Sequence, residues 1–340
     1  MNRREVLRPL NPLYAAATAV RNLAYDRRVL TAQTLPHPVI SVGNLSTGGT
    51  GKTPFVFELA KLLTAAGRQP IILSRGFGRT STATMRVDPN GSAAQFGDEP
   101  LLLARLSGVP VYVGADRYRA GQLAISELVL RPHTIFLLDD GFQHRQLARD
   151  IDIVLVTAAD LRDRLLPGGN LREPFSSLAR AHILVLREED AALAPKIRKR
   201  FHAASCSRPL IWTIRRSLDL DPLSVPPSVP LDRAVAFAGI AHPEEFLASL
   251  RNHGVTLVGA HAFPDHHPFT FRDVATILAS AKRANATALL TTEKDFVRLD
   301  APARQSLQAA LPLAAIPLRT ELTDAPLAVQ QIFALCVRQS

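Results

Sequence analysis

The sequence predicts an α/β protein in which parallel strands are covered by helices on both faces. Short apolar runs recur through residues 36–216 and alternate with longer amphipathic stretches. Such runs are typical of buried parallel strands, because these strands have no solvent-facing side. A glycine-rich loop after the first run and a proline-rich stretch near 217–233 are the two further observations that set the organisation. The predicted strands lie at 38–43, 70–75, 109–114, 134–140, 152–157, 182–187 and 209–216.

A second, smaller α/β/α domain is predicted after the proline-rich stretch. Strand-like and helical stretches resume at residue 234 and end on a strand at 314–322 and a C-terminal helix. Alternation of this kind is typical of layered α/β domains, and proline-rich stretches commonly separate domains. We therefore divide the chain into an N-terminal helix (1–35), a larger α/β/α domain (36–216), a linker (217–233) and the smaller domain (234–340).

The composition combines ordinary globular character with an excess of positive charge. The 340 residues are 47% hydrophobic and carry a formal net charge of +10, which favours an anionic partner such as nucleic acid, an anionic membrane surface or a phosphorylated substrate. Aromatic residues make up only 6% and do not interleave with basic residues, so nucleic acid is the weakest of the three and is not expected as a partner. Two cysteines, Cys206 and Cys336, are too few for a disulfide framework and predict a reducing compartment.

The N-terminal segment 10–28 predicts an amphipathic helix. Its apolar run, Leu13 to Val20, is interrupted by Arg21 and is shorter than the roughly 20 residues that span a bilayer. A helix with Leu13, Ala17, Val20 and Ala24 on one face fits a membrane interface, and from the pattern alone it fits packing on its own domain equally well. A signal peptide is the third interpretation, disfavoured because it would place the following nucleotide site outside the cell.

The segment VISVGNLSTGGTGKTP at residues 39–54 predicts a phosphate-binding loop between a strand and a helix. Glycines allow successive backbone N–H groups to converge on phosphate oxygens, and the helix N-terminus adds its positive end. The lysine would reach the β- and γ-phosphates, and the threonine hydroxyl after it would help to hold Mg²⁺. The residues expected to contact the nucleotide are Ser46, Thr47, Gly48, Gly49, Thr50, Gly51, Lys52 and Thr53.

This loop departs from the usual pattern in one place. Ser46 stands where the first glycine is expected, and the doubled glycine resembles the deviant Walker loop, although Thr47 replaces the extra lysine of that variant. A deviant-loop ATPase that acts as a membrane-associated switch is therefore the alternative function. A glycine-rich turn with a chance Lys-Thr pair is disfavoured, because the predicted strand before the loop and the predicted helix after it are the setting that a phosphate-binding loop requires.

Asp139 and Asp140 end the apolar run at 134–140 and supply the acidic part expected of a P-loop site. Two adjacent carboxylates at a buried strand end are costly without a cation, and Mg²⁺ takes such carboxylates together with phosphate oxygens. A strand that ends in an ordinary turn is the alternative. The Asn-Lys-x-Asp element that reads guanine is missing from the sequence, where TTEKD (291–295) has lysine and aspartate adjacent, so ATP is favoured.

Seven motifs carry a more specific resemblance. They occur in order as NLSTGGTGKTP, LSRGFGR (73–79), GDEP (97–100), DDGFQH (139–144), LLPGGNLREP (165–174), FPDHHPF (263–269) and TTEKD. Together they resemble the tetraacyldisaccharide 4′-kinases, the lipid A 4′-kinases of Gram-negative envelope synthesis within the P-loop NTPase superfamily. The resemblance runs from the N-terminal helix to about Asp295.

The resemblance implies a reaction and a set of site residues. The γ-phosphoryl group of ATP would pass to the 4′-hydroxyl of tetraacyldisaccharide 1-phosphate, giving lipid IVA. Asp98 would be the catalytic base, paired with His266 of the other domain, and Lys52 would assist catalysis. Mg²⁺ would be held by Thr53, Asp139, Asp140 and Glu173, and the phosphates would also be met by Gln143 and His144. Arg75, Arg79 and Arg117 are predicted as contacts to phosphates or to an anionic headgroup, and a surface or core-capping role fits each of them equally well.

The same resemblance implies a location on the membrane. The substrate is a lipid, so the protein is expected to lie peripherally on the cytoplasmic face of the inner membrane, where basic charge is attracted to anionic lipids. A separate metal site at Asp265, His266 and His267 is disfavoured, because no companion ligand cluster is apparent in the sequence. A catalytically silent P-loop scaffold is disfavoured because Lys52, Thr53, Asp139 and Asp140 are intact.

Overall fold

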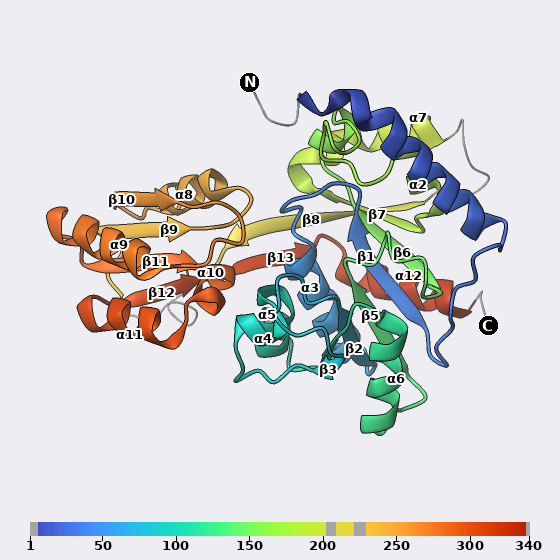
Figure 1. The fold of residues 1–340 in the computed structure, drawn as a ribbon, viewed down its shortest axis with the longest axis horizontal. Helices are drawn as coiled ribbons and strands as arrows, with labels where there is room; N and C mark the ends of the chain where they lie inside the picture. Colours follow the sequence, from blue (N-terminus) through green and yellow to red (C-terminus); the bar gives the residue numbers. More distant parts are fainter. Residues whose placement is uncertain (1–5, 202–208, 221–228, 338–340) are drawn as a thin grey trace.

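The computed structural model describes residues 6–201, 209–220 and 229–337 and arranges them in two lobes (Figure 1). Within these residues the larger lobe holds a nine-stranded sheet with the order β13-β8-β7-β6-β1-β5-β2-β4-β3. Only the edge strands β13 and β3 pair antiparallel with their neighbours. The strands are β1 (Val39–Asn44), β2 (Gln69–Ser74), β3 (Met85–Arg86), β4 (Val111–Val113), β5 (Thr134–Asp139), β6 (Ile151–Leu155), β7 (Ile183–Arg187), β8 (Leu210–Leu218) and β13 (Leu318–Leu322).

Helices cover both faces of this sheet. Alternate residues of β1 point to opposite sides: Ile40 and Val42 join the cluster that contains Phe55, and Val39 joins the cluster that contains Ala120. This two-sided burial explains the uninterrupted apolar runs. The α-helices are α2 (Asn11–Asp26), α3 (Lys52–Ala65), α4 (Ala93–Phe96), α5 (Asp98–Ser107), α6 (Arg117–Glu127), α7 (Ala194–Phe201) and α12 (Ala325–Val337), and the 3-10 helices are η1 (Arg8–Leu10), η2 (Ala159–Leu161), η3 (Phe175–Arg180) and η4 (Glu188–Leu193).

The smaller lobe repeats the layered plan on a parallel sheet of order β10-β9-β11-β12. Ala234 and Ala236 of the central strand face the cluster of Leu250, whereas Val235 and Phe237 face the opposite cluster. The predicted α/β class with two α/β/α units is therefore confirmed. The elements are β9 (Ala234–Ala238), β10 (Leu257–Ala262), β11 (Ala288–Thr292), β12 (Leu313–Ile316), α8 (Pro243–Asn252), α9 (Phe271–Arg283), α10 (Glu293–Arg298) and α11 (Ala301–Ala310).

The predicted C-terminal boundary is wrong, because the chain returns to the larger lobe after residue 316. The run 314–322 is not one strand: β12 joins the smaller sheet, and β13 pairs with β8 in the larger one. Pro317 separates them, and proline lacks the N–H that a continuous ladder needs. Helix α12 then buries Ile332 in the core of the larger lobe.

The connection between the lobes is therefore two-stranded (Figure 1). Strand β8 runs outward to Leu218, into the segment that we predicted as a linker, and β13 returns beside it in the opposite direction. Residues 221–228 of the predicted linker lie outside the described residues.

Helix α2 lies against the larger lobe (Figure 1) and contacts it through polar side chains. The Tyr14 hydroxyl donates to the Arg172 carbonyl at 3.0 Å, and Arg145 donates to the Asp26 carboxylate at 2.7 Å. The opposite side is apolar and exposed, with Leu13 at 72% and Val20 at 66%. The predicted helix is confirmed, and its packing leaves the apolar stripe outward. Among the described helices, none combines the length and the hydropathy that crossing a bilayer requires.

Candidate active site

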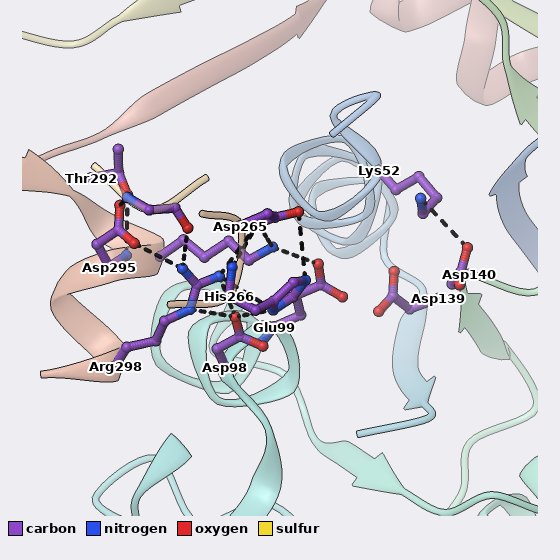
Figure 2. Close-up of polar contacts among 12 residues, drawn as sticks. Lys52, Asp98, Glu99, Asp139, Asp140, Asp265, His266, Thr292, Asp295 and Arg298 are labelled. Carbon is purple, nitrogen blue, oxygen red and sulfur yellow. Dashed lines mark hydrogen bonds and ion pairs between the residues drawn. The ribbon is translucent and has the colours of Figure 1, made fainter. Parts of the chain in front are cut away.

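The glycine-rich loop connects the end of β1 to the start of α3. Gly48 and Gly51 have φ values of 121° and 90°, a backbone region that L side chains rarely adopt, so glycine allows the chain to turn into the helix. Lys52 is the first residue of α3, and its Nζ donates to Asn44 Oδ1 at 3.0 Å. The same ammonium lies 3.5 Å from the Asp140 carboxylate (Figure 2). The loop thus presents backbone N–H groups, a helix N-terminus and a cation at one place.

Asp139 and Asp140 face this loop because β5 is the direct neighbour of β1. The register pairs Val42 with Asp139, which brings the carboxyl end of β5 beside the start of the loop. Asp140, with φ of 51°, accepts two contacts from Arg172 Nη1 at 2.9 and 2.8 Å. Asp139 is 2% exposed and accepts a hydrogen bond from Ser74 Oγ at 2.9 Å.

The two aspartates titrate differently. Burial and the charges of Glu99 and Asp140 raise the pKa of the Asp139 carboxyl. Burial also raises the pKa of Asp140, but Lys52 and Arg172 outweigh it and lower that pKa to about 2. Asp140 therefore has two cations of the protein beside it, whereas for Asp139 burial and the neighbouring negative charges outweigh the opposing effects of Ser74 and Lys52. An acid in this position would be stabilised in its ionised form by a metal cation.

The donor set fits Mg²⁺ only in part. Thr53, Asp139 and Asp140 provide hard oxygen donors beside the loop, as Mg²⁺ prefers. The structure does not bring Glu173 to them: its Oε2 accepts from Asn22 at 2.9 Å and from Arg180 at 2.9 Å. Across the described residues, no three carboxylate, histidine or cysteine side chains form a group that could hold a metal. Of the four residues expected to hold Mg²⁺, three therefore remain candidates in this structure: Thr53, Asp139 and Asp140.

Gln143 and His144 follow in the turn after β5. Gln143 Nε2 donates to the Asn44 carbonyl at 2.9 Å, which ties this side chain to the strand that leads into the loop. His144 is partly buried, and burial followed by the charges of Arg117 and Arg149 lowers its pKa to about 3. Its Nε2 is buried and has no hydrogen-bond partner among the described residues. A buried polar nitrogen without a partner calls for a ligand or another explanation.

Asp98 and His266 meet at the junction of the lobes, as the resemblance implied. Asp98 begins α5 in the larger lobe and is 6% exposed, and His266, with φ of 60°, belongs to a loop of the smaller lobe. His266 Nδ1 lies 3.0 Å from Asp98 Oδ2 (Figure 2). Burial by itself raises the pKa of Asp98, but the His266 hydrogen bond and the charges of Lys294 and Arg298 hold that pKa well below its usual range.

Two cations at this junction were not predicted as site residues. Arg298 donates from Nε to Asp98 Oδ2 at 2.7 Å and from Nη1 to Asp295 Oδ1 at 2.8 Å. Lys294 donates to Glu99 Oε1 at 3.0 Å (Figure 2 shows the network). Both cations lie in or just after TTEKD and their partners in GDEP, motifs that the sequence analysis singled out. The motifs indicate that the residues matter, but the pairing between them is a tertiary contact.

Arg298 is expected to stabilise the junction strongly. The side chains of Arg298, Asp98 and Asp295 are only 6%, 7% and 0% exposed. Removing one member of a buried ion network leaves uncompensated charge and typically costs about 3–5 kcal/mol. We expect Arg298→Met to lower the free energy of unfolding in urea by that amount. The exposed Arg272→Met is the control and should stay within about 0.5 kcal/mol of the original protein. A loss below about 1 kcal/mol for Arg298→Met would contradict the buried network.

Of the three arginines that were proposed as anion contacts, Arg75 is exposed, whereas Arg117 and Arg79 bond to nearby carbonyls. Arg117 is buried, donates to the Ala115 carbonyl at 2.7 Å, and has its pKa lowered to about 10 by burial and by Arg75. The charges of Asp139 and Asp140 act on Arg117, which places it near the loop site. Arg79 donates to the Ala83 carbonyl at 2.6 Å and so holds its own loop. His267 lies 3.0 Å from Asp273, which completes the capping box of α9 with the N-cap Thr270, and this contact explains His267 without a metal.

Comparisons with known proteins agree with this geometry. The family model described as tetraacyldisaccharide-1-P 4′-kinase matches residues 3–336. The tetraacyldisaccharide 4′-kinase of Koribacter versatilis is 39% identical over 341 residues, covering 98% of this chain and 99% of the relative. The enzyme of the same description from Chlorobium phaeovibrioides is 40% identical over 309 residues, covering 86% of each.

A solved structure is similar over the same extent. The structure of LpxK from Aquifex aeolicus, described as an "apo" form in complex with ATP, superposes with a TM-score of 0.75 at 33% identity, covering 98% of this chain and 99% of that one. This chain belongs to the tetraacyldisaccharide 4′-kinase family. The resemblance carried by the seven motifs is thereby confirmed, and with it the prediction that the chain is a lipid A pathway kinase.

Proposed function

We propose that this member of the tetraacyldisaccharide 4′-kinase family transfers the γ-phosphoryl group of ATP from the loop at residues 46–53 to the sugar hydroxyl of its lipid acceptor at Asp98. The observation that carries this proposal is the arrangement of two lobes. Lys52 and the paired aspartates lie in one, and His266 reaches Asp98 from the other at 3.0 Å. The charge of Glu99, which follows Asp98, raises the pKa of Asp139, so the two clusters lie within electrostatic reach.

The loop would bind the triphosphate of ATP. Its backbone N–H groups and the N-terminus of α3 favour phosphate oxygens, and the Lys52 ammonium would neutralise charge on the transferred group. That the solved structure at 33% identity is an ATP complex supports the same ligand here. Thr53, Asp139 and Asp140 would hold Mg²⁺, which when bound neutralises phosphate charge during transfer. Gln143 and His144 lie on the same side of the sheet end and would contact the phosphates.

Asp98 would orient the acceptor hydroxyl and receive its proton. In the described arrangement Asp98 is held by His266 and Arg298, and these contacts keep its carboxyl ionised. An ionised aspartate that accepts a hydrogen bond from the attacking hydroxyl is the arrangement that kinases use, because phosphoryl transfer depends on positioning more than on a strong base. His266 would keep the carboxylate oriented across the lobe junction.

Helix α2 would bring the enzyme to its lipid substrate at the cytoplasmic face of the inner membrane. Its exposed stripe includes Leu13 and Val20, and the chain carries an excess of basic residues. An amphipathic helix with an apolar outer face binds in the headgroup region, and basic charge adds attraction to anionic lipids. The protein would therefore bind the membrane peripherally.

The membrane role predicts a loss of vesicle binding when the stripe is made polar. A Leu13→Ser, Val20→Ser double variant should bind vesicles of anionic phospholipid at least about tenfold more weakly, because each apolar side chain that leaves water contributes up to about 1.5–3 kcal/mol. Co-sedimentation with the vesicles measures this. Val129→Ser, which alters a 90% exposed valine two residues after the end of α6, is the matched control and should bind as the original protein does. Equal sedimentation of the double variant would assign α2 a purely structural role.

Label transfer tests the reaction itself. The protein is incubated with Mg²⁺, ATP labelled with ³²P at the γ position, and tetraacyldisaccharide 1-phosphate, and the products are separated by thin-layer chromatography. We expect the label in the lipid. Label released only as free phosphate would instead support the membrane-associated ATPase switch, and unchanged ATP would contradict both.

A further inference from the structure

Arg216 brings a guanidinium from the connection between the lobes to the phosphate-binding loop. It lies on β8 and pairs in register with Thr320 of the returning strand β13. Its neighbour Arg215 points to the other side of the strand, is exposed, and pairs with Glu188 at 2.9 Å. Adjacent residues of a strand face opposite ways, so the two arginines present one cation to solvent and one to the interior.

The guanidinium of Arg216 lies directly against Gly51. A Cβ atom placed on Gly51 would meet Arg216 Cζ and Nε at 3.4 Å each and Nη1 at 3.5 Å. Gly51 is the residue before Lys52, where the loop turns into α3. The smaller lobe approaches the loop as well, since a Cβ on Gly49 would lie 3.0 Å from the Ala241 Cβ. Arg216 and the 239–242 turn therefore form part of the wall around the loop.

Two donors of this guanidinium are unused. Nε and Nη1 of Arg216 are buried and have no hydrogen-bond partner in the part of the chain that the structure describes. Buried polar groups are nearly always hydrogen-bonded, and a buried donor without a partner calls for a ligand or another explanation. Arginine presents its donors in a planar fork that matches the oxygens of a phosphate group.

The local charges point to an anion. Burial and the nearby Arg187 lower the pKa of Arg216 to about 10. The charges of Glu245 and Glu189 partly offset this effect, but both carboxylates form their ion pairs with Arg187, at 3.7 and 3.2 Å. Arg216 also stands at the N-terminus of α3, which carries partial positive charge. The positive charge of Arg216 is therefore unfavourable beside Arg187 and the N-terminus of α3 until an anion binds there.

We propose that Arg216 is a nucleotide-binding residue whose guanidinium donates to phosphate oxygens of the nucleotide held in the loop at residues 46–53. This inference rests on the proposed function, because it takes the loop as the ATP site. Arg216 belongs to β8, so the bound phosphates are also tied to the strand that connects the lobes. Nucleotide binding thereby restrains the position of the smaller lobe, which carries His266.

Calorimetry with matched variants tests this assignment. The titrant is the nonhydrolysable ATP analogue AMP-PNP with Mg²⁺, and the variants are Arg216→Gln, Arg216→Lys and, as control, Arg215→Gln on the same strand. We expect Arg216→Gln to bind at least about tenfold more weakly, Arg216→Lys to lose less, and Arg215→Gln to bind within about twofold of the original protein. Because a charge-assisted hydrogen bond is stronger than a neutral one, a tenfold loss is a conservative expectation.

Thermal unfolding separates a ligand contact from a structural role. Without nucleotide, Arg216→Gln should unfold at or above the original melting temperature, because an uncompensated buried charge is removed. With saturating AMP-PNP the increase in melting temperature should be smaller than in the original protein. A lower melting temperature without nucleotide, or unchanged affinity in both Arg216 variants, would overturn the assignment of Arg216 alone. Failure of the original protein to bind AMP-PNP would overturn the proposed function as well.

Discussion

Replacing Asp98 with asparagine should lower kcat for phosphoryl transfer by about 10²–10⁴-fold while leaving the affinity for AMP-PNP within about threefold of the original value. Asparagine keeps the size of the side chain but offers no anionic acceptor to the sugar hydroxyl. The nucleotide loop lies on β1 and α3 and makes no contact with Asp98 among the described hydrogen bonds, so ATP binding should survive. Steady-state label transfer and calorimetry measure the two quantities.

The interpretation of this variant depends on its stability, because Asp98 also pairs with Arg298. Urea unfolding of Asp98→Asn should accompany the kinetics, so that kcat is compared only between folded proteins. Asp300→Asn is the control: this aspartate caps α11 by accepting from the Ala303 N–H at 2.8 Å and lies outside the proposed site. Its kcat should remain unchanged. A folded Asp98→Asn enzyme with the original kcat would exclude Asp98 from the mechanism.

Replacing Lys52 with methionine should lower kcat/KM by about 10³-fold, with contributions from weaker nucleotide binding and slower transfer. Methionine has a similar length and flexibility but no charge. It leaves Asp140 with Arg172 as its cation partner in the described structure, so the fold should persist. Label transfer gives kcat/KM, and the affinity for AMP-PNP separates the binding part from the transfer part.

Lys61 offers a matched control on the same helix. It lies 3.8 Å from Glu58 and is 65% exposed, so its charge is far better solvated than that of Lys52. Lys61→Met should retain kcat/KM within about twofold, in keeping with the small contributions of exposed ion pairs. If Lys52→Met were as active as Lys61→Met, the loop would not be the site of phosphoryl transfer.

Much of the fold could be predicted because its signals are local. The uninterrupted apolar run of β1 indicates burial on both faces, and the glycine at position 51 with the lysine after it indicates a turn into a helix. Both expectations agree with the structure. The two-residue strand β3 was not predicted, since two residues show no periodicity. The division of residues 314–322 between two sheets was not predicted, because the two halves look like one strand in the sequence. The sheet that each half joins depends on distant partners.

The site was predicted unevenly for the same reason. The motifs named Asp98 and His266, and the structure places them in contact although 168 positions separate them. The Asp98–Arg298 pair spans 200 positions and was not foreseen. Glu173 was expected beside the aspartates, but its carboxylate turns to Arg180. Nothing near Arg216 in the sequence marks it as different from Arg215; only the alternation of β8 and the position of Gly51 distinguish them.

The sequence by itself determined most of the elements of this protein, the chemistry of its loop and its family, because periodicity, glycine placement and ordered motifs are properties of neighbouring residues. Only the tertiary structure decided which distant groups meet. The chain crosses between the lobes on β8 and returns on β13, and this crossing sets the partners of Asp98 and the neighbour of Gly51. Contacts of this kind join residues that are far apart in the chain, and they follow from how whole sheets and helices pack. The residues next to each partner in the sequence therefore do not reveal them.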